Sequence, residues 1–135
     1  MNPTANKVIS FLIIGVCTLV FGCRDSPTTT WSTEARSSDG HWLAVARSQQ
    51  WSGPGNAYDA TTVSLKRTDD SEPPTQILLF SHDSARMDLK MKWATPSHLD
   101  VAYGSHARLD FQVAKCAGID ISVQDLSNEA TNPSQ

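Results

Sequence analysis

The sequence predicts an all-β protein: a small antiparallel sheet or sandwich of about seven strands built from hairpins. After Cys23, apolar and polar residues alternate with a period of two, and the spacing of an amphipathic helix is hard to find. Gly, Pro, Asn and Asp separate the alternating runs, as they do in β-hairpins. The 135 residues leave room for one domain.

The first 22 residues have the pattern of a secretory signal peptide. Lys7 is the only charged side chain before Arg24, and residues 8–22 are almost entirely apolar. A membrane-spanning helix needs about 20 apolar residues, and this run is shorter. We therefore expect residues 1–22 to be removed, with an uncleaved membrane anchor as the alternative.

The end of the apolar run reads Val20-Phe21-Gly22-Cys23 and resembles the lipobox of bacterial lipoproteins. The resemblance implies that Cys23 becomes the mature N-terminus and carries a diacylglycerol and an N-acyl chain. Two or more acyl chains hold a protein stably on a bilayer. Arg24 stands where an aspartate would retain such a protein in the inner membrane, so the resemblance favours the outer membrane, facing the periplasm. In the alternative, a plain secretory signal, Cys23 is incidental.

The cysteines leave no internal disulfide in such a lipoprotein. Cys17 is lost with the signal and the sulfur of Cys23 carries lipid, so Cys116 alone remains of the three. We expect it to be either a buried, inert thiol or part of an intermolecular pair.

The mature chain divides into three parts. Residues 23–30 are expected to form a polar, lipidated tether, residues 31–126 the β-domain, and residues 127–135 a disordered tail. Strands are predicted at residues 41–48, 61–68, 75–81, 87–93, 98–103, 108–115 and 118–125. Two apolar stretches, WLAVA and ILLF, are typical of strands inside a packed sheet.

The alternation also predicts which side chains point inward. The inward sets are Met87, Leu89, Met91 and Trp93; Leu99, Val101 and Tyr103; Leu109, Phe111 and Val113; and Ile119, Ile121 and Val123. Residues 87–93 and 98–103 flank a proline turn and should form a hairpin. Lys90 or Lys92 would then face Asp100.

Two stretches resemble the strand–turn–strand unit of propeller blades in periplasmic translocation proteins. They read EARSSDGHWLAVAR and MKWATPSHLDVAYG. A closed propeller needs at least four four-stranded blades, more than this chain holds, so the motif indicates hairpins only. The chain as a whole resembles short bacterial lipoproteins of unknown function.

The sequence contains no motif with a catalytic mechanism. His82, Asp83 and His98 are the candidates for a metal site, and a small metal-dependent hydrolase is the alternative function they would support. Ser105 and His106 are adjacent, and neighbours on an extended chain point in opposite directions. We expect no catalytic residue, no metal and no cofactor other than the covalent lipid.

A loop at residues 49–62 is the most distinctive stretch outside the expected core. It contains Trp51 and Tyr58, which belong to residue types enriched at binding hot spots. The pair either binds a partner, or Trp51 folds back to cap the core. The 11 basic residues are scattered among 14 acidic ones, which argues against a nucleic-acid partner. The sequence therefore predicts a non-catalytic module that binds a protein or an envelope component, with an inhibitor or immunity-type lipoprotein as a further alternative.

Overall fold

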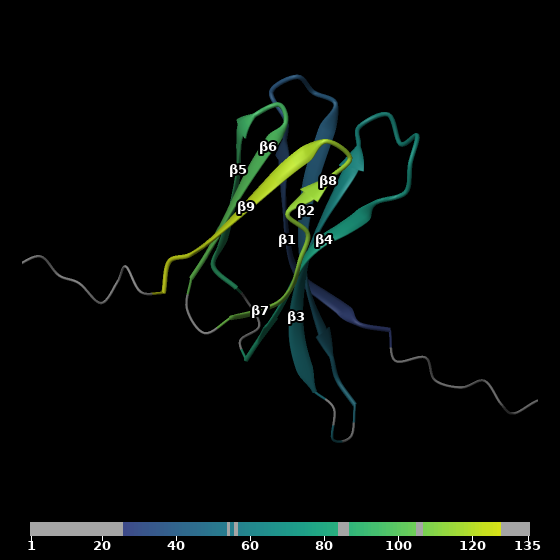
Figure 1. The fold of residues 1–135 in the computed structure, drawn as a ribbon. Coiled ribbons are helices and arrows are strands. Elements are labelled where there is room, and N and C mark those ends of the chain that lie inside the picture. The colour runs from purple at the N-terminus through teal and green to yellow at the C-terminus, as the bar shows by residue number, and fades with distance from the viewer. Residues whose placement is uncertain (1–25, 54, 56, 84–86, 105–106, 128–135) are drawn as a thin grey trace, which may run out of the picture.

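The computed structural model of the chain describes residues 26–53, 55, 57–83, 87–104 and 107–127. This part of the chain forms nine strands and no helix, which confirms the all-β prediction (Figure 1). The strands are β1 (Thr28–Arg36), β2 (Trp42–Trp51), β3 (Tyr58–Arg67), β4 (Thr75–His82), β5 (Leu89–Thr95), β6 (His98–Tyr103), β7 (Arg108–Gln112), β8 (Lys115–Cys116) and β9 (Ile119–Asp125).

The strands form two sheets. The five-stranded sheet has the order β1-β2-β3-β4-β7 and is antiparallel throughout, whereas the four-stranded sheet has the order β5-β6-β9-β8. In the second sheet β6 and β9 run parallel, so the expectation of an entirely antiparallel protein is wrong at this pair. The chain leaves β6, contributes β7 to the other sheet, and returns through β8 to enter β9 in the direction of β6.

Two strands were not among the seven expected runs, although the hairpin predicted from residues 34–47 is formed by β1 and β2. β1 begins at Thr28, so the last three residues assigned to the tether, 28–30, belong to the sheet. The run at residues 108–115 is broken after Gln112 into β7 and the start of β8. The other six expected strands are present, and Lys92 lies opposite Asp100 in the β5–β6 hairpin.

One core joins the two sheets. Buried side chains from both contribute to it, and the rings of Phe80 (β4) and Tyr103 (β6) approach to 4.9 Å between centroids. At its margin, Trp93 Nε1 on β5 donates a hydrogen bond of 3.0 Å to the carbonyl oxygen of Ala35 on β1. The sheets therefore pack as one unit through apolar burial.

Phe111 corrects the predicted inward pattern. Leu109 lies opposite Phe80 and Phe111 opposite Leu79, so β7 has one extra residue, Asp110, between them. Such a bulge reverses the face of every side chain beyond it. Leu109 packs against the core, whereas Phe111 is 44% exposed on the outer face.

The domain has two distinct ends. The β1–β2 and β3–β4 connections lie at the top of Figure 1, which we call the turn end, and the β2–β3 connection lies at the bottom, which we call the hairpin end. β2 runs from Trp42 at the turn end to Trp51 at the hairpin end. The first strand residue, Thr28, lies opposite Gln50, so the chain enters the domain at the hairpin end.

Candidate binding surface at the hairpin end

A stacked aromatic pair, one ring exposed and the other partly buried, marks the hairpin end. Trp51 is the last residue of β2 and pairs with Tyr58, the first residue of β3, so the expected loop at residues 49–62 is wrong at both of its ends, which are strand. The two rings stack with centroids 4.7 Å apart and planes 5° apart. Tyr58 is 54% exposed. Trp51 stacks on Tyr58 and is not among the residues that pack against the described core. Among the described contacts, the stacking on Tyr58 favours the alternative in which the pair binds a partner, which stays a prediction.

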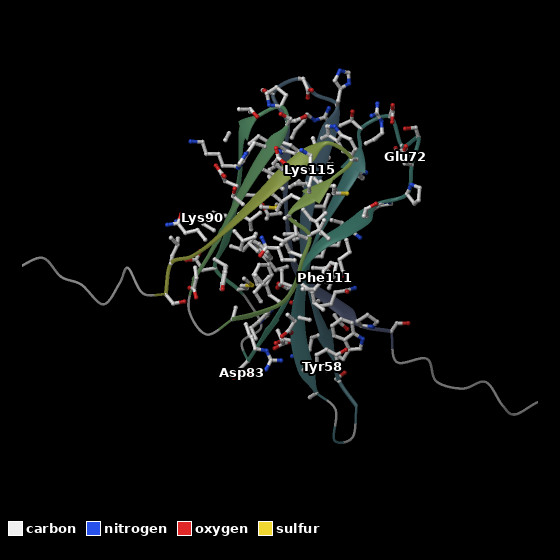
Figure 2. The ribbon with its side chains drawn as sticks, viewed as in Figure 1. Tyr58, Glu72, Asp83, Lys90, Phe111 and Lys115 are labelled. Carbon is white, nitrogen blue, oxygen red and sulfur yellow. The ribbon has the colours of Figure 1, made fainter. Side chains whose placement is uncertain are left out.

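A pocket lies beside this pair. It has a volume of about 290 Å³ and is lined by Gln50, Ala57, Tyr58, Asp59, His82 and Asp83. These residues come from the ends of β2, β3 and β4, and Figure 2 shows Tyr58 and Asp83 at the same end of the molecule. The pocket thus combines two carboxylates, an amide, an imidazole and an aromatic ring.

Asp59 leaves an acceptor unused in this pocket. Its Oδ1 is buried and has no hydrogen-bond partner in the described structure. A buried polar atom without a partner costs about 1–3 kcal/mol.

A buried row of hydrogen-bonded side chains runs from His82, which lines the pocket, through Thr61 to Ser48. The hydroxyls of Ser48 and Thr61 are 2.7 Å apart, and Thr61 Oγ1 is 2.8 Å from His82 Nε2. All three residues are buried. Hydrogen bonds in such a setting fix the His82 ring and rigidify the pocket.

The sequence contains a pattern that indicates this row of buried polar side chains. Ser48 follows the inward positions Ala44 and Ala46, and Thr61 precedes Val63 and Leu65 on the same face of β3. Hydroxyls at inward positions of adjacent strands need each other as partners when they are buried.

The structure does not bring His82, Asp83 and His98 together. His82 ends β4 in the five-stranded sheet, whereas His98 begins β6 in the other sheet. The β5–β6 turn before His98 lies at the top of Figure 1, while Asp83 is labelled at the bottom of Figure 2. No three His, Cys, Asp or Glu side chains within the described ranges are placed to hold a metal ion. The site expected of a metal-dependent hydrolase is not assembled from these residues.

His98 belongs to a different polar group. Its Nε2 lies 2.7 Å from Ser122 Oγ and 3.1 Å from Asp100 Oδ1. In a serine-hydrolase triad the serine and the aspartate bond different ring nitrogens, so that one nitrogen is free to take the serine proton. Here both partners share Nε2. The group is therefore not arranged as a catalytic triad, although its composition matches one.

The parallel pairing of β6 and β9 creates this group by placing Asp100 opposite Ser122. That contact was not foreseen because the sequence predicted antiparallel neighbours only.

A second hollow lies on the outer face of the five-stranded sheet. It has a volume of about 220 Å³ and contains Glu34, Arg47 and Lys66 among its lining residues. Charges of both signs face it, so no single ligand charge is favoured. The pocket at the hairpin end differs because two carboxylates line it and no Lys or Arg does among its described lining residues.

The basic residue of β7, Arg108, already pairs with a carboxylate. Arg108 lies opposite Ser81, and its Nε is 2.6 Å from Asp110 Oδ1. Hydrogen bonds from Arg108 and then Ser81 lower the pKa of Asp110. Arg108 is thus held by its own strand.

The remaining candidates lie elsewhere. Cys116 is a free thiol, partly buried against the core on β8. Residues 1–22, Cys23, Ser105 and His106 lie outside the described residues. Within the described ranges, no helix has the length and apolar character needed to cross a bilayer.

No family model, curated protein or solved structure matches this chain.

Proposed function

We propose that this chain is a lipid-anchored lipoprotein of the bacterial cell envelope whose β-domain is a non-catalytic binding module. The anchor rests on the lipobox-like residues that end in Cys23. The observation that carries the binding role is the stacked Trp51–Tyr58 pair, in which Tyr58 is 54% exposed and Trp51 is partly buried. The domain faces the periplasm, in the outer membrane in this proposal, and its partner is a protein or another envelope component.

The geometry supports recognition at this pair. Trp and Tyr supply large contact areas and are enriched among residues that dominate binding energy. Trp51 and Tyr58 close a pair of ten-residue strands, so the hairpin holds the rings in place before a partner arrives. A preformed surface loses little conformational entropy on binding. Inhibition of a periplasmic enzyme would be one form of such binding.

The binding role is tested by changing both rings. In cells, Trp51→Ser with Tyr58→Ser should strongly reduce the recovery of whatever protein or lipid co-purifies with the chain. Phe111→Ser is the matched control, because it removes another exposed aromatic from a different strand. If the double variant stays folded and keeps every partner, the binding surface is elsewhere.

The anchor is tested separately. Intact-mass analysis of the mature chain should show an N-terminus at Cys23 with added acyl chains, and Cys23→Ser should move the chain out of the membrane fraction. A mature N-terminus at any other residue would contradict the anchor.

A further inference from the structure

We propose that the hairpin end lies in the headgroup layer of the bilayer that holds the anchor, so that phospholipid headgroups are the partner of the Trp51–Tyr58 surface. This inference rests on the proposed acylation of Cys23 and names the envelope component that the proposed function leaves open.

The length of chain before β1 limits how far this end can lie from the membrane. Thr28, the first strand residue, is five residues after Cys23 (28 − 23). Five residues span at most about 18 Å even when fully extended. Thr28 lies opposite Gln50, the neighbour of Trp51. The anchor therefore keeps the aromatic pair close to the bilayer surface.

The opposite end is much farther from the anchor. β2 contains nine residue steps between Trp42 and Trp51, and at about 3.3 Å per step these two residues lie about 30 Å apart. Trp42 is partly buried, with the Arg67 guanidinium 5.4 Å from its ring centroid. The two tryptophans thus mark the far and near ends of one rigid strand.

The chemistry of the near end suits a bilayer interface. Trp and Tyr concentrate at the headgroup level of membranes, where an apolar ring with a polar edge is stable. Tyr58 is exposed and stacked on Trp51, so the two present their ring surface together. This placement gives the stack a partner without requiring a second protein.

Charge selects the kind of headgroup. Asp59 and Asp83 line the adjacent pocket, and Oδ1 of Asp59 has no hydrogen-bond partner in the described structure. Two carboxylates repel anionic headgroups and attract ammonium groups. A primary ammonium, as in ethanolamine headgroups, also carries N–H donors for carboxylates that line the pocket, whereas a quaternary ammonium carries none. We therefore infer a preference for zwitterionic lipids with a primary ammonium.

The two ends of β2 provide the experiment. The full acylated chain, labelled with 5-fluorotryptophan, is placed in vesicles that contain a lipid with a paramagnetic headgroup, and ¹⁹F line broadening is measured. Substitution of each tryptophan by Phe assigns the resonances. The Trp51 resonance should broaden several-fold more than that of Trp42. Tyr58→Ser should reduce the Trp51 effect, and Phe111→Ser should leave it unchanged.

The outcomes separate this inference from the proposed function. A chain that is not acylated, or does not sediment with vesicles, overturns both. A chain that sediments but shows equal broadening of Trp42 and Trp51, or stronger broadening of Trp42, overturns the membrane-facing orientation alone.

The headgroup preference is tested in vesicles of three compositions. Broadening of Trp51 should be strongest with phosphatidylethanolamine, weaker with phosphatidylcholine alone and weakest with phosphatidylglycerol. Asp59→Asn with Asp83→Asn should remove this order, and the matched pair Asp88→Asn with Asp120→Asn should keep it. Strongest broadening with phosphatidylglycerol would overturn the preference.

Discussion

The two ends of the domain use their carboxylates differently. At the turn end, Asp39 accepts hydrogen bonds from the Ser37 hydroxyl at 2.6 Å and the His41 amide at 3.1 Å. Asp69 there accepts bonds from the Ser71 amide and hydroxyl at 3.0 and 2.7 Å. At the hairpin end, a buried oxygen of Asp59 has no described partner.

The carboxylates of the turn end stabilise their turns through hydrogen bonds, whereas the buried oxygen of Asp59 makes none in the described structure. Hydrogen bonds lower the pKa of Asp39 and Asp69, because they favour the charged form. Carboxylates in turns therefore contribute to the fold. A buried acceptor without a partner opposes folding instead of supporting it.

The largest effect is expected behind the pocket, where Thr61→Val would remove the hydroxyl that joins Ser48 to His82. Both neighbours would then lose a hydrogen-bond partner inside the protein. The free energy of unfolding should fall by about 2 kcal/mol, measured by urea denaturation. Thr62→Val, on the outer face of the same strand, is the control and should change it by less than about 0.5 kcal/mol. Equal losses in both variants would contradict the structural role of the buried row.

A smaller loss is expected at the turn end. Ser37 is buried, and its hydroxyl donates to Asp39 and accepts a 3.0 Å bond from the Trp42 amide. Ser37→Ala should lower the free energy of unfolding by about 1 kcal/mol. Its exposed neighbour provides the control, Ser38→Ala, and if both cost the same, the turn does not depend on the Ser37 hydroxyl.

The contribution of Asp69 to stability should depend on pH. Hydrogen bonds from Ser71 and then Arg67 lower its pKa from 3.8 to about 2. Because the folded-state pKa lies below the unfolded value, the stabilisation is present above pH 3.8 and is lost as the pH falls towards 2. Asp69→Asn should therefore lose less stability than the parent between these pH values, in denaturation curves recorded at each pH. Glu72→Gln removes a charge from the same loop as a control.

The smallest effect on stability is expected for Asp59. Asp59→Asn removes a charge whose buried oxygen has no described partner, so the free energy of unfolding should not fall by more than about 0.5 kcal/mol. A loss comparable to that of Ser37→Ala would show that the two ends do not differ in the way described, and that Asp59 supports the fold.

The strands could be predicted because period-two alternation is a local property of the chain. It placed Leu89, Leu99 and Ile121 in the core correctly. The prediction that Phe111 points inward was wrong because a single extra residue in β7 turns its side chain to the outer face. A bulge depends on the pairing with the partner strand, which the local sequence does not show. The parallel β6–β9 pair was not predicted because it depends on β7 joining the other sheet.

The candidate site was predictable only in part. Trp51 and Tyr58 stood out by residue type in a loop-forming stretch, but their stacking follows from the register of β2 and β3. Asp59 has no distinguishing sequence context, because its importance comes from burial. His82 and His98 were grouped because both flank strands, and the division of those strands between two sheets separates them.

β7 belongs to the five-stranded sheet, whereas the two strands on either side of it in the sequence, β6 and β8, belong to the other sheet, and this order affects how fast the domain folds. β6 and β9 cannot pair until the residues between them, which include β7 and β8, have been synthesised. Contacts between distant parts of a sequence form slowly, so this topology should fold more slowly than one made only of successive hairpins. The β6–β9 pair is therefore expected to form late in folding.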